Sequence, residues 1–169
     1  MKQQGITLIE LVVAMAVMAL VGMAAVTVLE SSVDVYDDAE NKVTAQDKIG
    51  YAVSRLSREL RQITEAAGGG PKITTMTASQ IVFEKQDATV VDVQLNGSDI
   101  TMDYSTVSGG PYVLSDGISA FSLTYYQSDG VTAVTDPAQV ATVAFVEFAL
   151  TVVDGGASYD RSTRVALRI

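Results

Sequence analysis

The N-terminal part of the chain carries a nearly uninterrupted run of apolar residues at positions 11–29. At about 1.5 Å per residue, a helix of that length crosses the roughly 30 Å hydrocarbon core of a bilayer. Glu10 directly precedes the run, so it falls in the first turn of the predicted helix. A carboxylate in lipid costs about 3 kcal/mol, which makes Glu10 unsuited to a plain anchor. We expect the helix to leave the bilayer and Glu10 to pair with a positive group on a neighbouring copy.

Beyond residue 29 the apolar positions follow a one-sided helical pattern. Residues 29–67 contain no proline and a single glycine, and apolar residues recur mostly at steps of three or four. This spacing predicts an amphipathic continuation of the same helix. Gly68-Gly69-Gly70-Pro71 should then end it, because glycine tolerates left-handed backbone and proline lacks a donor. The predicted apolar face consists of Leu29, Val33, Tyr36, Val43, Ile49, Val53, Leu56, Leu60, Ile63 and Ala67.

After Pro71 the apolar period changes to two, which predicts β-strands at residues 80–85, 89–95, 99–104, 118–127, 140–153 and 161–169. Asn96-Gly97 between two of these predicts a hairpin with a type I′ turn. The alternation predicts an antiparallel sheet with one covered face, and the helical face over residues 53–67 is the expected cover. The predicted fold class is therefore α+β, with a long N-terminal transmembrane and amphipathic helix packed on an antiparallel β-sheet.

Composition narrows the range of functions. The chain has no cysteine, which rules out a disulfide or a thiolate site, and no histidine, the usual general base and commonest transition-metal ligand. Its net charge of −9 argues against nucleic acid, because phosphate binding needs a basic surface. We therefore expect no enzymatic activity, no catalytic residue, no cofactor and no metal.

Aspartates are scattered through the second half of the chain. Most fall at predicted turns, where aspartate is favoured by hydrogen bonds from its side chain to the backbone. A calcium site is the alternative interpretation, although no EF-hand spacing is present. The residues concerned are Asp87, Asp92, Asp99, Asp103, Asp116, Asp129, Asp136, Asp154 and Asp160.

The N-terminal segment Gly5-Ile6-Thr7-Leu8-Ile9-Glu10, followed by about twenty apolar residues, resembles the class III signal of type IV pilins and type II secretion pseudopilins. The resemblance implies a leader at residues 1–5 that prepilin peptidase removes between Gly5 and Ile6. It also implies that Ile6, where the family most often has Phe, becomes an N-methylated N-terminus. Glu10, the fifth mature residue, would be the residue used in assembly.

The segment Arg55-Leu56-Ser57-Arg58-Glu59-Leu60-Arg61-Gln62 resembles a helix of the minor pilin W and minor pseudopilin J families. Residues 113–118, 123–126, 129–130, 146–150 and 163–168 resemble the same families in order and spacing. This likeness implies a low-copy subunit that primes or caps a type IV pilus or type II secretion pseudopilus. Residue by residue, the same motifs equally fit ordinary packing, and the arginines also fit a solvated face with helical ion pairs.

The resemblance also implies a domain organisation and a set of partners. The expected segments are a leader (1–5), a transmembrane and assembly helix (6–29), an amphipathic continuation (30–67) and an extracytoplasmic β-sheet domain (68–169). Lys2 before the apolar run and the acidic residues after it favour an N-inside topology in the inner membrane. Expected partners are other minor and major pilins or pseudopilins, prepilin peptidase, the inner-membrane assembly platform and, before assembly, the lipid bilayer; nucleic acid is not expected.

Other interpretations of the N-terminus stay open. Residues 11–21 also fit the apolar region of a secretory signal, with Gly22-Met23-Ala24 as the cleavage site. An uncleaved anchor is a further possibility. Either one would make the chain a signal-anchored extracytoplasmic binding protein that does not polymerise. Within the pilin interpretation, a type IV pilus, a type II secretion system and a DNA-uptake system fit the sequence equally.

Overall fold

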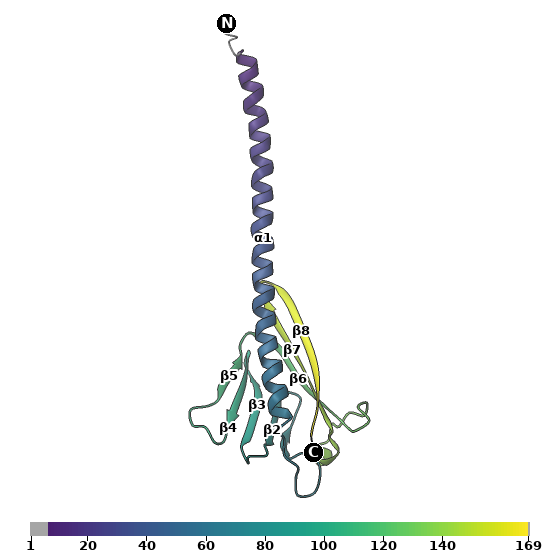
Figure 1. The fold of residues 1–169 in the computed structure, drawn as a ribbon. Helices are drawn as coiled ribbons and strands as arrows, with labels where there is room; N and C mark the ends of the chain where they lie inside the picture. Colours follow the sequence, from purple (N-terminus) through teal and green to yellow (C-terminus); the bar gives the residue numbers. More distant parts are fainter. Residues whose placement is uncertain (1–6, 169) are drawn as a thin grey trace. The chain divides into compact units, whose positions relative to one another are not determined.

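A helix of 53 residues, α1 (Leu8–Leu60), begins the computed structural model, which describes residues 7–168. The chain divides into two compact units, Met1–Asn41 and Lys42–Ile169, and α1 contributes to both. Strands and one short 3-10 helix follow α1 in the second unit (Figure 1). They are β1 (Ile73–Met76), β2 (Gln80–Glu84), β3 (Val90–Asn96), β4 (Asp99–Tyr104), β5 (Tyr112–Ser115), β6 (Ile118–Tyr126), η1 (Pro137–Thr142), β7 (Phe145–Asp154) and β8 (Ala157–Ala166). The predicted α+β class is confirmed.

The C-terminal end of α1 lies earlier than predicted, at Leu60 rather than Ala67. The N–H groups of Gln62 and Ile63 donate to carbonyls three residues back, which tightens the last turn. Ile63 then forms a β-bridge with Lys85 and becomes fully buried. Backbone pairing with the sheet therefore replaces helical hydrogen bonds before the glycine run begins.

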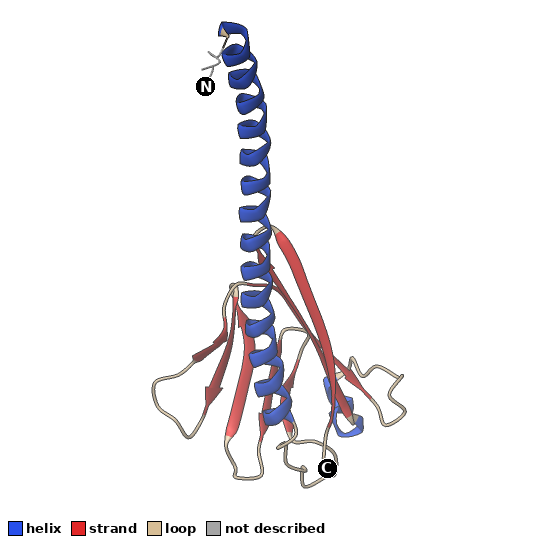
Figure 2. Cartoon of the chain, turned by 45° about the horizontal axis from the view of Figure 1, so that its top comes forward, coloured by secondary structure: helices blue, strands red, loops and turns tan. Residues whose placement is uncertain are grey.

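The strands form two antiparallel sheets instead of the single predicted sheet (Figure 2). The first has the order β1-β2-β3-β4-β5 and the second the order β6-β7-β8. β6 reaches the first sheet through the turns at its strand ends: the N–H of Ile118 donates to the carbonyl of Ser98 at 2.8 Å, and that of Leu123 to Ala78 at 2.7 Å. Because β6 meets strand ends and not a strand edge, the ladder is interrupted there.

Two short elements alter the predicted strand pattern. β1 and β5 have four residues each, too few for a two-residue period to stand out. The predicted strand at 140–153 begins only at Phe145, because η1 occupies the preceding residues. Asp136 caps η1 by accepting a hydrogen bond from the N–H of Ala138, and Pro137 suits the first helical turn.

The hairpin between β3 and β4 is present, but its turn is shifted by one residue. Asn96 pairs with Asp99, so the central residues are Gly97 and Ser98 and not Asn96 and Gly97. Gly97 has φ of +65°, whereas Ser98 has no positive φ. A single positive φ at the first central position is the type II′ pattern, so the predicted type I′ turn is wrong. Asn96 instead completes the ladder.

The second unit has one hydrophobic core, which α1 shares with both sheets. In Figure 1 the last turns of α1 run along the region where the two sheets meet. The helical cover begins at Ala45, eight residues before the predicted start, because alanines there let the helix approach the strands closely. The opposing face of β7 is buried as its alternation predicts, through Val146, Phe148, Leu150 and Val152.

Candidate assembly helix and a buried carboxylate

The N-terminal part of α1 exposes apolar side chains on all sides. Every residue from Leu8 to Glu40 is exposed, and Leu8 and Met18 reach 82 % and 74 %. By length and composition, α1 is the helix of the described chain that could cross a membrane. An apolar surface of this extent is unfavourable in water and requires lipid or other helices around it.

Glu10 lies in the first turn of this surface and takes part in a helix cap. Its N–H donates to the carbonyl oxygen of Thr7 at 3.1 Å and lies 3.4 Å from the Thr7 hydroxyl oxygen. Thr7 and Glu10 thus occupy the two defining positions of a capping box. The carboxylate also lies at the positive end of the helix dipole. The Thr-x-x-Glu spacing in the sequence indicates this capping role. From the sequence we had inferred only an assembly role for Glu10.

The other residues of the predicted processing site, Gly5 and Ile6, lie outside the described residues. Within residues 7–168, Glu10 forms no ion pair.

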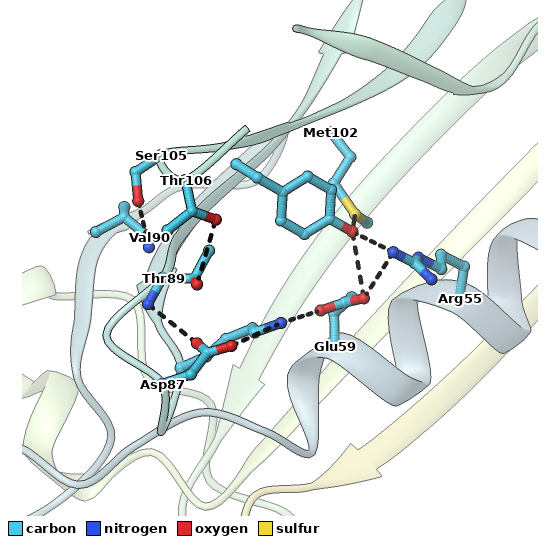
Figure 3. Close-up of polar contacts among 10 residues, drawn as sticks. Arg55, Glu59, Asp87, Thr89, Val90, Met102, Ser105 and Thr106 are labelled. Atoms are coloured by element: carbon cyan, nitrogen blue, oxygen red, sulfur yellow. Dashed lines mark hydrogen bonds and ion pairs between the residues drawn. The ribbon is translucent and has the colours of Figure 1, made fainter. Parts of the chain in front are cut away.

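A second carboxylate, Glu59, is almost completely buried near the end of α1, with 3 % of its surface exposed. Figure 3 shows Arg55 and Glu59 facing each other, with Nη2 of Arg55 3.1 Å from Oε1 of Glu59. The Tyr104 hydroxyl donates to the same oxygen at 3.2 Å, and Nζ of Lys85 donates to Oε2 at 3.2 Å. Glu59 therefore joins α1 to the end of β4 and to the residue that follows β2.

The charges around Glu59 are fixed by their contacts. A hydrogen bond to the Tyr104 oxygen, 2.7 Å long, raises the pKa of Arg55. Burial raises the pKa of Tyr104, which keeps its phenol protonated at neutral pH. The N–H of Thr89 donates to Asp87 and lowers the pKa of that carboxyl, which lies 3.8 Å from Lys85. This network contains two acids, two basic side chains and a phenol, an arrangement that suits fastening of the fold.

The arginines of the same segment separate into two kinds. Arg55 and Glu59 form the helical ion pair that was one expectation for this row. Arg58 and Arg61 are exposed and form no ion pair within residues 7–168. A solvated face was one of the two interpretations of this row, and for Glu59 it is wrong, because Lys85 and Tyr104, distant in sequence, cover it.

Three of the nine aspartates, Asp87, Asp129 and Asp136, have the turn roles expected of them, whereas five lie within strands: Asp92, Asp99, Asp103, Asp154 and Asp160. Asp129 accepts hydrogen bonds from the N–H groups of Val131 and Thr132, both at 2.9 Å, and from the Thr132 hydroxyl, and these bonds lower its pKa. Asp87 and Asp136 accept backbone N–H groups in the same manner. Across residues 7–168, no three acidic side chains gather in a group that could hold a metal ion.

We expect Glu59→Ala to lower the free energy of unfolding by about 3 kcal/mol, because it leaves the largely buried Lys85 with only the more distant and exposed carboxylate of Asp87 as a counter-charge. Glu84→Ala is the matched control: it removes the partner of the more exposed Lys72 and should cost at most about 1 kcal/mol. Urea unfolding of the full-length protein in detergent, followed by circular dichroism, measures both. Equal losses would mean that Glu59 contributes no more than a surface pair.

Comparison with known families adds one finding to this geometry. The family model of the prokaryotic N-terminal methylation motif matches residues 1–26, which include Gly5, Ile6, Glu10 and most of the apolar run. No curated protein matches the chain. The methylation motif, the exposed apolar helix and the antiparallel sheets that follow it mark the chain as a type IV pilin-like or pseudopilin-like protein.

Proposed function

We propose that this chain is a non-catalytic minor pilin or pseudopilin that primes or caps a type IV pilus or a type II secretion pseudopilus. The observation that carries the proposal is Glu10 in the first turn of an exposed apolar helix, within the matched methylation motif. A plain anchor gains at most a helix cap from a carboxylate in that position, and lipid penalises the charge. A helix that leaves the bilayer for a bundle of like helices gains a charge partner.

In this mechanism the subunit first sits in the inner membrane with its N-terminus inside. Prepilin peptidase removes residues 1–5, and Ile6 becomes a methylated N-terminus. The assembly platform then moves the helix from lipid into the bundle, where the Glu10 carboxylate meets the ammonium of Ile6, its own or a neighbour's. Screening is weak in such a medium, so the pair is stronger there than in water.

The assignment to a minor subunit is supported by the likeness in residues 55–62. Within that segment Leu56, Glu59 and Leu60 are buried and serve the fold. Arg58 and Arg61 stay at the surface, where they are available to other subunits. A priming subunit makes complementary contacts with a few different partners. A protein present in few copies is sufficient for such contacts.

The N-terminus of the membrane-extracted protein should begin at Ile6, with or without one methyl group, by intact-mass analysis or Edman degradation. Gly5→Arg should abolish cleavage, because a bulky side chain obstructs the approach of the peptidase to the backbone. A mature N-terminus at Ala24 or Ala25 would establish the secretory-signal interpretation in place of ours.

Glu10→Leu should leave cleavage and membrane insertion intact but sharply reduce co-purification with partner pilins. Glu10→Gln separates the two roles of this residue, because glutamine also serves at this position of a capping box but carries no charge. If charge matters, both variants lose partner binding to a similar degree. Full binding by Glu10→Gln would reduce Glu10 to a capping residue.

Deletion of the gene should strongly lower the number of filaments, or the secretion that they support, while the protein itself stays scarce in the sheared filament fraction. Quantitative mass spectrometry of that fraction, normalised to the major pilin, measures the scarcity. If the protein is instead the most abundant component, it forms the shaft, and only the broader pilin assignment stands.

A further inference from the structure

The exposed charges of α1 are segregated by sign. Between Leu8 and Asn41 there is no lysine or arginine, and the segment at residues 30–40 exposes five acidic side chains. Around residues 55–61 the charges at the surface are arginines, because the acid among them, Glu59, is buried. The acids of the first segment form no ion pair within residues 7–168, and neither do Arg58 and Arg61.

The two segments share one spacing. Asp34, Asp37 and Glu40 follow each other at three-residue steps, and so do Arg55, Arg58 and Arg61. Each acid therefore precedes an arginine by the same 21 positions. Arg61 keeps this helical spacing beyond the last residue of α1, because its N–H still donates to the carbonyl of Ser57 at 3.3 Å. Two parallel segments placed side by side bring every arginine within a helical turn of a carboxylate, a distance that its long side chain spans.

We propose that the arginine segment (residues 55–61) of one copy binds the acidic segment (residues 34–40) of a second, parallel copy displaced by 21 residues. The second copy is the occupant because both complementary rows, with matching spacing, belong to this one chain. Nη1 and Nε of Arg55 can donate to a carboxylate of the second copy without disturbing Glu59, since the bonds of Arg55 within the described chain all use Nη2.

The displacement also makes the contact specific to one state. Two copies anchored by the same apolar segment lie at one depth in the bilayer, where acidic segment faces acidic segment and like charges repel. In that arrangement the arginine segments also face each other and repel. Moving one copy by 21 residues along the other replaces these two repulsions with one attraction between an arginine segment and an acidic segment. The condition that a copy is moved out of the bilayer rests on the proposed function, whereas the pairing itself rests only on the charges. A displaced pair is also compatible with a priming role. It leaves the acidic segment of one copy and the arginine segment of the other copy unpaired, and further subunits can bind to them.

Disulfide trapping tests the register, and the chain has no native cysteine to interfere. Val33 and Ser54 are both exposed, lie next to the two rows and are also 21 positions apart. Full-length Val33→Cys and Ser54→Cys proteins with different tags are mixed at a large excess of detergent micelles, so that each apolar segment occupies its own micelle and no bilayer or assembly machinery fixes the relative depth of two copies, and are then oxidised. We expect the 33–54 dimer to exceed the 33–33 dimer, and its yield to fall as salt is added.

Charge reversal provides the matched variants. Asp37→Arg and Arg58→Asp, each made in both tagged proteins, should lower the 33–54 yield roughly fivefold, the scale of one surface ion pair. The double variant, with both reversals in each copy, should restore the yield because the contact is re-formed with opposite polarity. Both positions are exposed, so the fold is not at risk.

The outcomes separate this proposal from the proposed function. A dominant 33–33 dimer, or no rescue by the double variant, overturns the displaced contact even if the protein enters filaments in cells. A trapped and rescuable 33–54 dimer in micelles supports the contact even if deletion of the gene leaves filaments unchanged. In cells, the cleavage-defective Gly5→Arg protein should give less 33–54 dimer than the native leader sequence, and an equal yield would overturn the state specificity.

Discussion

Burial of one face of α1 against two sheets is the interaction on which the second unit depends. Ala45 and Ala52 are fully buried, and their small side chains let the helix backbone come close to the strands. Ile49, Leu56 and Leu60 fill the space between the helix and the strands. Each contributes about 1.5–3 kcal/mol from the transfer of apolar surface out of water. Neither sheet extends the ladder of the other, so the helix supplies the surface that both cover. The carboxylate of Glu59 lies next to this face, and it is tolerated there because Arg55, Lys85 and Tyr104 neutralise and hydrogen-bond it.

Sequence patterns predicted the features that are repeated over many residues. The change of apolar period from helical to alternating identified the long helix, the α+β class and the buried face of β7. The N-terminal motif indicated a type IV pilin-like or pseudopilin-like protein, because glycine, carboxylate and apolar run stand in a fixed register. These signals depend only on residues close together in the sequence, so they can be read without knowledge of the tertiary structure.

Features decided by tertiary contacts were mispredicted. α1 ends at Leu60 because Ile63 pairs with Lys85, a residue that sequence spacing does not bring near. The hairpin turn moved by one residue because pairing of Asn96 with Asp99 extends the ladder. Glu59 looked like one more charge on a solvated row, yet two residues distant in sequence cover it. Thr7 is different: its capping role was readable from its distance to Glu10, and the interest of Glu10 for assembly obscured it.

The helix cap at Thr7 has a consequence for the precursor and the mature protein. Both Thr7 and Glu10 follow the expected cleavage point, so removal of the proposed leader would keep both partners of these hydrogen bonds. The proposed cleavage would, however, create a positively charged amine at Ile6, one residue before Thr7 in the sequence, and the helix that begins after Thr7 presents the positive end of its dipole. Two like charges then meet at one helix end in a medium that solvates them poorly. Glu10 is the nearest negative charge in the sequence, so the proposed processing would give this helix end a need for a carboxylate that the precursor lacks.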